Sequence, residues 1–186
     1  KYKIDISQLN LDWSSSYFTG TECSLAELGY SRDHRPDKPQ IKLGLAQIND
    51  IKIAFDFFDN RGNIPDVSEF SPTYLKIAER VPKGTLIVYD KGGSSEENNR
   101  LVAETGNYYL TAHKMSGRIK KKILTINKTG MEKVKEGYLC LKEKTGSGYD
   151  YFFWSERLAK QTRERRERNA KEMIAKAKAR QAEIRE

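Results

Sequence analysis

The sequence has little of the chemistry on which thiol, histidine and membrane functions depend. Its 186 residues include two cysteines, Cys23 and Cys140, and two histidines, His34 and His113, all isolated from one another. A disulfide framework, a Cys/His zinc site and a Ser-His-Asp triad therefore have too few residues to form. No apolar run approaches the roughly 18 residues of a membrane span, and no secretory leader opens the chain.

Hydrophobic residues are also scarce, at 37%, and the mean hydropathy is −0.77. The length allows one domain of ordinary size with an appendage, so we expect the core to be concentrated in part of the chain. The sequence opens at Lys1 within a strand-like pattern, from which we expect a fragment of a longer protein. Two separate thiols are typical of a reducing compartment, and we expect a cytoplasmic protein.

Positive charge is in excess. The chain has 34 Lys and Arg against 26 Asp and Glu, a net charge of +8 and a pI near 9.3. This balance favours an anionic partner, nucleic acid first and an anionic membrane surface second. A merely soluble basic surface is the alternative, because charge alone carries no specificity.

The first part of the chain has the alternating pattern of half-buried strands. Strands are expected over 2–12, 41–46 and 51–58. The turn at Asn49–Asp50 joins the last two as a hairpin, and the polar stretch 19–39 is expected to be a loop. Asp12 falls on the face opposite Leu9 and Leu11. The pattern leaves open whether it is an ordinary surface acid or a carboxylate at the end of a sheet.

Helices and strands then alternate. A helix is expected to begin at Ser71–Pro72, since proline suits the first helical position, and to end at Pro82–Gly84. The buried strand 86–89 delivers Asp90 to a Gly92–Gly93 turn. A helix over 97–104, capped by Ser94 and Ser95, and a strand over 108–112 follow. The order β-β-β-α-β-α-β predicts an α/β (α+β) fold, a mixed sheet with flanking helices.

From Lys114 the character changes, so we divide the chain into a core, 1–113, and a basic region, 114–186. The basic region opens with a cluster of cations and continues with strands 138–141 and 151–154, which predict a small hairpin around Gly146–Gly148. Residues 156–186 are almost all helix formers. A solvated charged helix and a DNA-facing helix both remain open for this segment. We discount a membrane-surface helix, because the aromatic-rich apolar face such helices use is missing.

Four segments together resemble the catalytic domain of bacterial and archaeal insertion-sequence transposases of the DDE type. They are Leu11–Phe18 (LDWSSSYF), Gly29–Gln40 (GYSRDHRPDKPQ), Gly62–Val67 (GNIPDV) and Val88–Gly92 (VYDKG). They are similar to that family's first-acid motif, its G-Y-S-K-D-x-x-P-D-x-x-Q segment, its G-N-x-x-D turn and its second-acid motif. Their order and spacing also agree. The resemblance covers about residues 4–160, and the basic helix is similar to the insertion these enzymes carry between their second and third acids.

This resemblance implies an RNase H-like fold in which Asp12 and Asp90 are catalytic acids that bind Mg²⁺ or Mn²⁺. In such two-metal sites the ions lie about 3.5–4 Å apart and clamp the oxygens of a phosphoryl displacement. Carboxylates suit Mg²⁺ because it prefers oxygen ligands. The implied activity is DNA strand cleavage followed by strand transfer at transposon ends, in the nucleoid of a prokaryotic cytoplasm. The implied partners are double-stranded DNA, as transposon ends and target, and a second copy of the chain in a synaptic homodimer. The expected DNA contacts are Lys91, Lys114, Arg118, Lys120, Lys121, Lys122, Arg163, Arg165, Arg166 and Arg168.

The sequence also departs from the family pattern. Trp13 and serines follow Asp12 where the family has threonines, and Lys91 stands where arginine is usual. The family's third acid lies in a Tyr-x-x-Arg-x-x-x-Glu pattern, and this pattern is missing here. Arg168 and Glu172 have the right interval, but Arg165 occupies the tyrosine position.

We therefore expect this fragment to be catalytically incomplete. For Asp66 we expect a structural role in its turn ahead of a functional one. The alternative to a transposase is a non-catalytic, basic nucleic-acid-binding module of RNase H-like fold.

Overall fold

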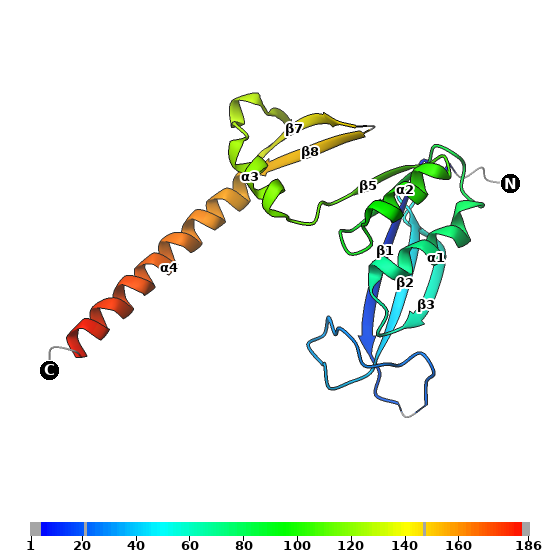
Figure 1. The fold of residues 1–186 in the computed structure, drawn as a ribbon, viewed down its shortest axis with the longest axis horizontal. Coiled ribbons are helices and arrows are strands. Elements are labelled where there is room, and N and C mark those ends of the chain that lie inside the picture. The colour runs from blue at the N-terminus through cyan, green and yellow to red at the C-terminus, as the bar shows by residue number, and fades with distance from the viewer. Residues whose placement is uncertain (1–4, 21, 147, 184–186) are drawn as a thin grey trace. The chain divides into compact units, whose positions relative to one another are not determined.

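Seven elements of the first half of the chain form a sheet with two helices. The computed structural model in Figure 1 describes residues 5–20, 22–146 and 148–183. The chain divides into two units, Lys1–Lys114 and Met115–Glu186, which we call the first and second units. The first unit contains β1 (Gln8–Tyr17), β2 (Gln40–Ile48), β3 (Ile53–Arg61), α1 (Asp66–Ala78), β4 (Leu86–Tyr89), α2 (Glu96–Glu104) and β5 (Tyr108–Thr111).

The sheet of the first unit has the strand order β3-β2-β1-β4-β5. β1, β2 and β3 form an antiparallel meander, whereas β4 and β5 both run parallel to β1. The parallel strands require crossover connections, which α1 and α2 provide. This mixed sheet with flanking helices, in the order of an RNase H-like fold, confirms the fold class expected from the sequence.

The core lies on one face of this sheet. Leu9, Leu11 and Trp13 alternate along β1 and are fully buried, because α1 and α2 lie side by side over that face (Figure 1). Phe70 of α1 sits at the centre of an aromatic cluster, with its ring centroid 6.0 Å from that of Trp13 and 4.4 Å from that of Tyr89. Asp12 therefore belongs to the opposite face of β1, which the described helices of this unit leave open.

Two boundaries differ from those expected. α1 begins at Asp66, and Pro72 lies inside it. The sequence GNIPD had been interpreted wholly as a turn, but its last residue already has helical geometry after Pro65. Of the strand expected from residue 2, residues 1–4 lie outside the described residues, and Asp5–Ser7 are not in a strand. Ile6 nevertheless packs against the core.

Gly29 and Gly62, from two of the sequence motifs, meet at a close contact of backbones. A Cβ atom on Gly62 would lie 1.9 Å from the carbonyl oxygen of Gln40, and one on Gly29 would lie 2.4 Å from the carbonyl oxygen of Gly62. No side chain fits at such distances, so only glycine lets the long loop approach β2 and the end of β3. The loop is thereby held against the sheet.

The second unit is built around a three-stranded antiparallel sheet of order β6-β7-β8. Its elements are α3 (Gly117–Thr125), a short 3₁₀ turn (Lys128–Gly130), β6 (Glu132–Lys135), β7 (Tyr138–Thr145), β8 (Gly148–Ser155) and α4 (Glu156–Glu183). β7 and β8 form the hairpin expected from the sequence, whereas β6 was not predicted. The described side chains of α4 are mostly exposed on every side of the helix. Within the described ranges, no helix is both long and apolar enough to cross a membrane.

Candidate active site

Asp12 and Asp90 lie on neighbouring parallel strands at the point where the pairing of those strands ends. The last register pair between β1 and β4 joins Leu11 to Tyr89, and each aspartate is the next residue along its chain. Paired strands are about 4.8 Å apart, and residues in register point to the same face. Both aspartates are exposed. Asp12 and Asp90 therefore directly follow the last register pair, at the carboxyl end of β4, where open α/β sheets commonly bind ligands.

The local backbone orients both carboxylates. Asp12 Oδ1 accepts a hydrogen bond from its neighbour Trp13 N at 2.9 Å. Asp90 Oδ1 accepts from Gly92 N at 2.8 Å and from Gly93 N at 3.3 Å, the arrangement by which an aspartate closes its own turn. No hydrogen bond from the described residues reaches Oδ2 of either side chain. One oxygen of each carboxylate is thus fixed and the other is available.

Gly92 separates Asp90 from a further carboxylate, that of Asp66. A Cβ atom on Gly92 would lie 2.8 Å from Asp66 Oδ2 and 2.9 Å from Asp90 Oδ1. The turn after β4 therefore has room only for glycine at this position. Asp66 and Asp90 approach the same point from two elements that are distant in the sequence.

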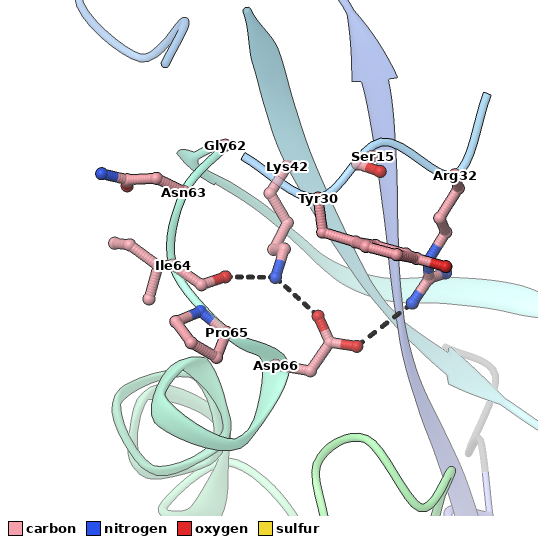
Figure 2. A pocket seen from close by; sticks show the side chains of 9 residues that line it. All are labelled: Ser15, Tyr30, Arg32, Lys42, Gly62, Asn63, Ile64, Pro65 and Asp66. Atoms are coloured by element: carbon pink, nitrogen blue, oxygen red, sulfur yellow. Dashed lines mark hydrogen bonds and ion pairs between the residues drawn. The ribbon is translucent and has the colours of Figure 1, made fainter. Parts of the chain in front are cut away.

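Two cations hold Asp66 in place. Lys42 Nζ lies 2.6 Å from Asp66 Oδ1 and also donates to the Ile64 carbonyl, while Arg32 Nη2 lies 3.1 Å from Asp66 Oδ2 (Figure 2). Arg32 Nη1 donates to the carbonyl oxygen of Trp13. The Lys42 side chain is only 10% exposed, so it depends on this carboxylate for neutralisation. Asp66 is the first residue of α1, and no side-chain hydrogen bond caps that helix. In place of the expected turn role, the structure gives Asp66 an ion-pair role that the sequence alone did not indicate.

The four sequence motifs converge around this network. Trp13, Arg32, Asp66 and Gly92 each come from a different motif, and each touches or adjoins the carboxylate of Asp66 or the guanidinium of Arg32. Segments separated by up to 79 positions (13 to 92) are thereby brought to one edge of the sheet. The network joins β1, β2, the long loop and the start of α1, and the turn that carries Asp90 passes close beside it.

A small pocket adjoins the ion pairs. It has a volume of about 290 Å³, and Figure 2 shows the side chains that line it, from Ser15 and Tyr30 to Asp66. Ser15 is buried, and its Oγ has no hydrogen-bond partner among the described residues. Tyr30 projects into solvent and is 84% exposed. Because the lining includes two cations, Lys42 and Arg32, and a single carboxylate, that of Asp66, the pocket lining has a net positive charge.

A second acid on α1 has a shifted pKa. Burial raises the pKa of Glu69 and the negative charge of Asp66 adds to this rise, whereas the positive charges of Lys42 and Lys76 offset it only in part. Tyr89, under the same helix, also has a raised pKa, because burial disfavours its phenolate. Its hydroxyl donates to Asn99 Oδ1 at 2.6 Å. These shifts arise from the packed interior beside the acid pair rather than from the pair itself.

The residues expected to contact DNA lie in both units. All of them except Lys122 are exposed. Lys91 is exposed in the turn directly after Asp90. The other exposed members are Lys114, Arg118, Lys120, Lys121, Arg163, Arg165, Arg166 and Arg168. Lys122 differs, because its Nζ lies 2.5 Å from Glu143 and 5.0 Å from the centre of the Phe152 ring. Lys122 thus anchors α3 to the hairpin.

Charge is divided unequally between the units. Residues 1–114 contain 14 Lys and Arg against 16 Asp and Glu, whereas residues 115–186 contain 20 against 10. The first unit is therefore slightly acidic and the second carries a net charge of +10. The excess of positive charge that suggested an anionic partner belongs to the second unit.

One set of exposed aromatic residues was not predicted from the sequence. Tyr149, Tyr151 and Phe153 of β8 project from one face of the second sheet. Their period-2 spacing was visible in the sequence, but it was interpreted only as evidence for a strand. The structure adds that the face carrying these rings is open.

No group of three or more His, Cys, Asp or Glu side chains is placed to hold a metal ion within the described part of the chain. Asp12 and Asp90 are a pair, and Asp66 is engaged by Lys42 and Arg32. A metal ion at the pair would therefore have two carboxylate ligands from the described residues.

Comparison with known proteins gives a structural likeness, and none in sequence. No family model matches the chain, and no curated protein matches it. Among solved structures, a cryo-EM structure of the piggyBac transposase synaptic complex with hairpin DNA is similar over 81% of this chain, at 13% identity and a TM-score of 0.49. The matched part spans 33% of that longer chain. No function is transferred from this likeness.

Proposed function

We propose that the chain is part of a DNA transposase of the DDE type, which cleaves and joins DNA strands at transposon ends. The observation that supports this most is the register of β1 and β4, which makes Asp12 and Asp90 neighbours at the carboxyl end of a strand pair. The convergence of four sequence motifs at the same edge supports it further.

The two carboxylates fit a hard divalent cation. Each has one oxygen oriented by its own backbone and one oxygen without a hydrogen bond from the described residues. Oxygen donors of this kind suit Mg²⁺ or Mn²⁺, so Asp12 and Asp90 would hold the metal ions of a two-metal site. Such ions, when bound, activate a water molecule and stabilise the leaving oxygen of a phosphodiester.

The residues around the pair have supporting tasks in this proposal. The backbone N–H groups of the Gly92–Gly93 turn orient Asp90, and Asp66, held by its ion pairs, lies close beside that turn. Lys91 is exposed beside Asp90, where its ammonium group contacts a DNA phosphate. Water attacks the phosphodiester at the transposon end, and the 3′-hydroxyl that this frees attacks the target DNA.

A third carboxylate is needed for the full reaction of this class. We do not assign Asp66 to it, because Lys42 and Arg32 occupy both of its oxygens. The proposal therefore expects metal binding by the present chain and no complete catalysis by it alone. Double-stranded DNA, as ends and target, and a second copy of the chain in a synaptic homodimer are the proposed partners.

Mn²⁺ binding is the direct test. We would titrate the chain with Mn²⁺, measure free Mn²⁺ by electron paramagnetic resonance, and locate bound Mn²⁺ in soaked crystals by anomalous scattering. We expect Asp12→Asn and Asp90→Asn each to weaken binding at least tenfold. Asp37→Asn is the matched control, because Asp37 is an exposed acid paired with Arg35. Equal Mn²⁺ affinity in all four proteins would remove the assignment of Asp12 and Asp90.

One observation favours a second candidate function, a nucleic-acid-binding module without chemistry. The positive charge is concentrated in the second unit, away from the acid pair in sequence. A pure binding module predicts that Asp12→Ala and Asp90→Ala leave DNA affinity unchanged or raise it in Mg²⁺ as in EDTA. The transposase proposal predicts instead that Mg²⁺ strengthens DNA binding by the unaltered chain and has no such effect on these variants.

A further inference from the structure

One face of the second sheet carries aromatic rings that are largely exposed in the described part of the chain. Alternate residues of β8, namely Tyr149, Tyr151 and Phe153, are 52%, 44% and 66% exposed. Lys144 is paired with Tyr149, and Lys142 with Tyr151, so both lysines project from the same face. We call these five residues the aromatic face.

The opposite face of the same sheet is occupied. Lys122 of α3 lies 3.9 Å from Asp150 and 5.0 Å from the centre of the Phe152 ring. Lys128, in the turn after α3, lies 3.6 Å from the centre of the Trp154 ring. The residues of β8 that alternate with the aromatic face are therefore packed against this unit's own chain. Within the hairpin, open aromatic rings are therefore a feature of the aromatic face and not of the opposite face.

The rings of the aromatic face already attract cations. Lys142 Nζ lies 4.0 Å from the centre of the Tyr149 ring and 5.8 Å from that of Tyr151. On the same side of the sheet, Lys135 lies 4.4 Å from the centre of the Tyr138 ring. Glu132, opposite Cys140, is an acid on this side. Lysines interleaved with open rings are the combination that binds unpaired nucleotides, because bases stack on the rings and phosphates contact the ammonium groups.

The spacing of the rings favours single strands over duplex. The centroids of Tyr149 and Tyr151 are 6.5 Å apart. Stacked bases in a duplex rise about 3.4 Å per step and expose only their edges. A strand whose bases are unstacked can instead present one base to each ring.

We propose that the aromatic face binds single-stranded DNA. Bases stack on Tyr149, Tyr151 and Phe153, and Lys142 and Lys144 contact the phosphates between them. The net charge of +10 on the second unit complements this ligand. The choice of DNA rests on the proposed transposase function, in which strand cleavage and joining produce unpaired ends.

Binding of a short, fluorescein-labelled oligothymidylate to the intact chain, followed by anisotropy in EDTA, tests the proposal. Tyr151→Leu keeps an apolar side chain but loses the ring face, and we expect about fivefold weaker binding or more. Tyr151→Phe keeps the ring and should bind like the unaltered chain. Tyr108→Ala, an exposed tyrosine of β5, is the control for loss of an aromatic side chain elsewhere. Circular dichroism shows that each variant is folded.

The salt dependence of the DNA affinity distinguishes the contribution of base stacking from that of phosphate contacts. Lys142→Gln should reduce the slope of log K against log salt by about 0.7, the value per phosphate contact on a single strand. Tyr151→Leu should lower the affinity without changing that slope. An unlabelled duplex of the same length should compete more weakly than the single strand.

Three results would overturn the inference. The first is that Tyr151→Leu binds as well as Tyr151→Phe, and the second is that duplex competes as well as single strand. The third is that ring variants alter the molar mass in light scattering while leaving DNA affinity intact, which would assign the face to a second copy of the chain. Asp12→Asn and Asp90→Asn should not affect binding in EDTA. Failure of the Mn²⁺ test would therefore remove the proposed chemistry and leave this measurement unchanged.

Discussion

At the scale of single residues, Asp66 joins segments that the sequence keeps far apart. Its carboxylate binds Lys42 of β2 and Arg32 of the long loop, and it lies beside the Gly92 position in the turn that carries Asp90. Asp66→Asn would leave the nearly buried Lys42 without a counter-charge. We expect a loss of about 2–3 kcal/mol in the free energy of unfolding of the first unit, measured by urea denaturation of the intact chain.

The matched control for Asp66 is Asp37. A hydrogen bond from Arg35 lowers the pKa of Asp37 to about 2, yet the pair is exposed to solvent. Exposed ion pairs add little to stability, so Asp37→Asn should leave the unfolding curve nearly unchanged. If both substitutions have the same small effect, the ion pairs of Asp66 do not hold the unit together.

Glu69 gives the first unit a pH dependence of known sign. Burial raises its pKa above the ordinary value of 4.5, so the folded state binds the carboxyl proton more tightly than the unfolded state does. The contribution of Glu69 to stability is complete below pH 4.5 and is lost as the pH rises through the raised pKa. Glu69→Gln cannot ionise and should escape that loss.

Thermal unfolding of Glu69→Gln across a pH series tests this. The melting temperature of the variant should match that of the unaltered chain in acid and exceed it by a few degrees at neutral pH. The reverse order, with the variant less stable only at neutral pH, would mean that ionised Glu69 is stabilised by Lys42 and Lys76 more than burial destabilises it.

At the scale of elements, the sequence predicted the helices and strands in which the local hydrophobic pattern matches the face that is buried in the structure. The hairpin β2–β3, the strand β4 and the capped helix α2 follow from alternation, turn residues and Ser95, whose Oγ accepts a hydrogen bond from Asn98 N. The start of α1 was wrong because Pro72 resembles a first helical residue, whereas packing of Phe70 against Trp13 favours helix from Asp66, six residues earlier. β6 was missed because its residues EKVK are short and exposed.

The candidate site was predictable only in part, because local sequence patterns do not contain contacts between distant segments. Asp12 lies within the first strand and Asp90 directly follows the buried strand β4, and the strand order indicates that these two strands can be neighbours. Their register, Leu11 with Tyr89, is a tertiary fact that no local pattern contains. The ion pairs of Asp66 join residues 24 and 34 positions apart, so composition and periodicity give no sign of them.

At the scale of the whole molecule, the two units carry different charge. The acids proposed to hold metal ions belong to a unit with 14 Lys and Arg against 16 Asp and Glu, and the basic unit has 20 against 10. A metal ion binds more tightly where few cationic side chains surround its ligands. Attraction of DNA instead requires a strongly cationic surface. In the proposed function, DNA binding is assigned to the second unit and cation binding to Asp12 and Asp90 of the first, so each activity is expected in the unit whose charge suits it.

The exposed helix α4 allows a test of how much of the proposed DNA binding is electrostatic. Arg163, Arg165, Arg166 and Arg168 lie within two turns of it, and their side chains are exposed. If they contact duplex phosphates, replacing all four with glutamine should reduce the slope of log K against log salt by up to about 0.9 for each contact, equally for any DNA sequence. Because α4 packs little against other elements, the variant should unfold like the unaltered chain. Replacing Arg35, Arg61, Arg80 and Arg100 of the first unit, which are paired with acids, should leave the slope unchanged. If the α4 variant has an unchanged slope, α4 is a solvated charged helix and the basic residues of α3 and the hairpin carry the duplex.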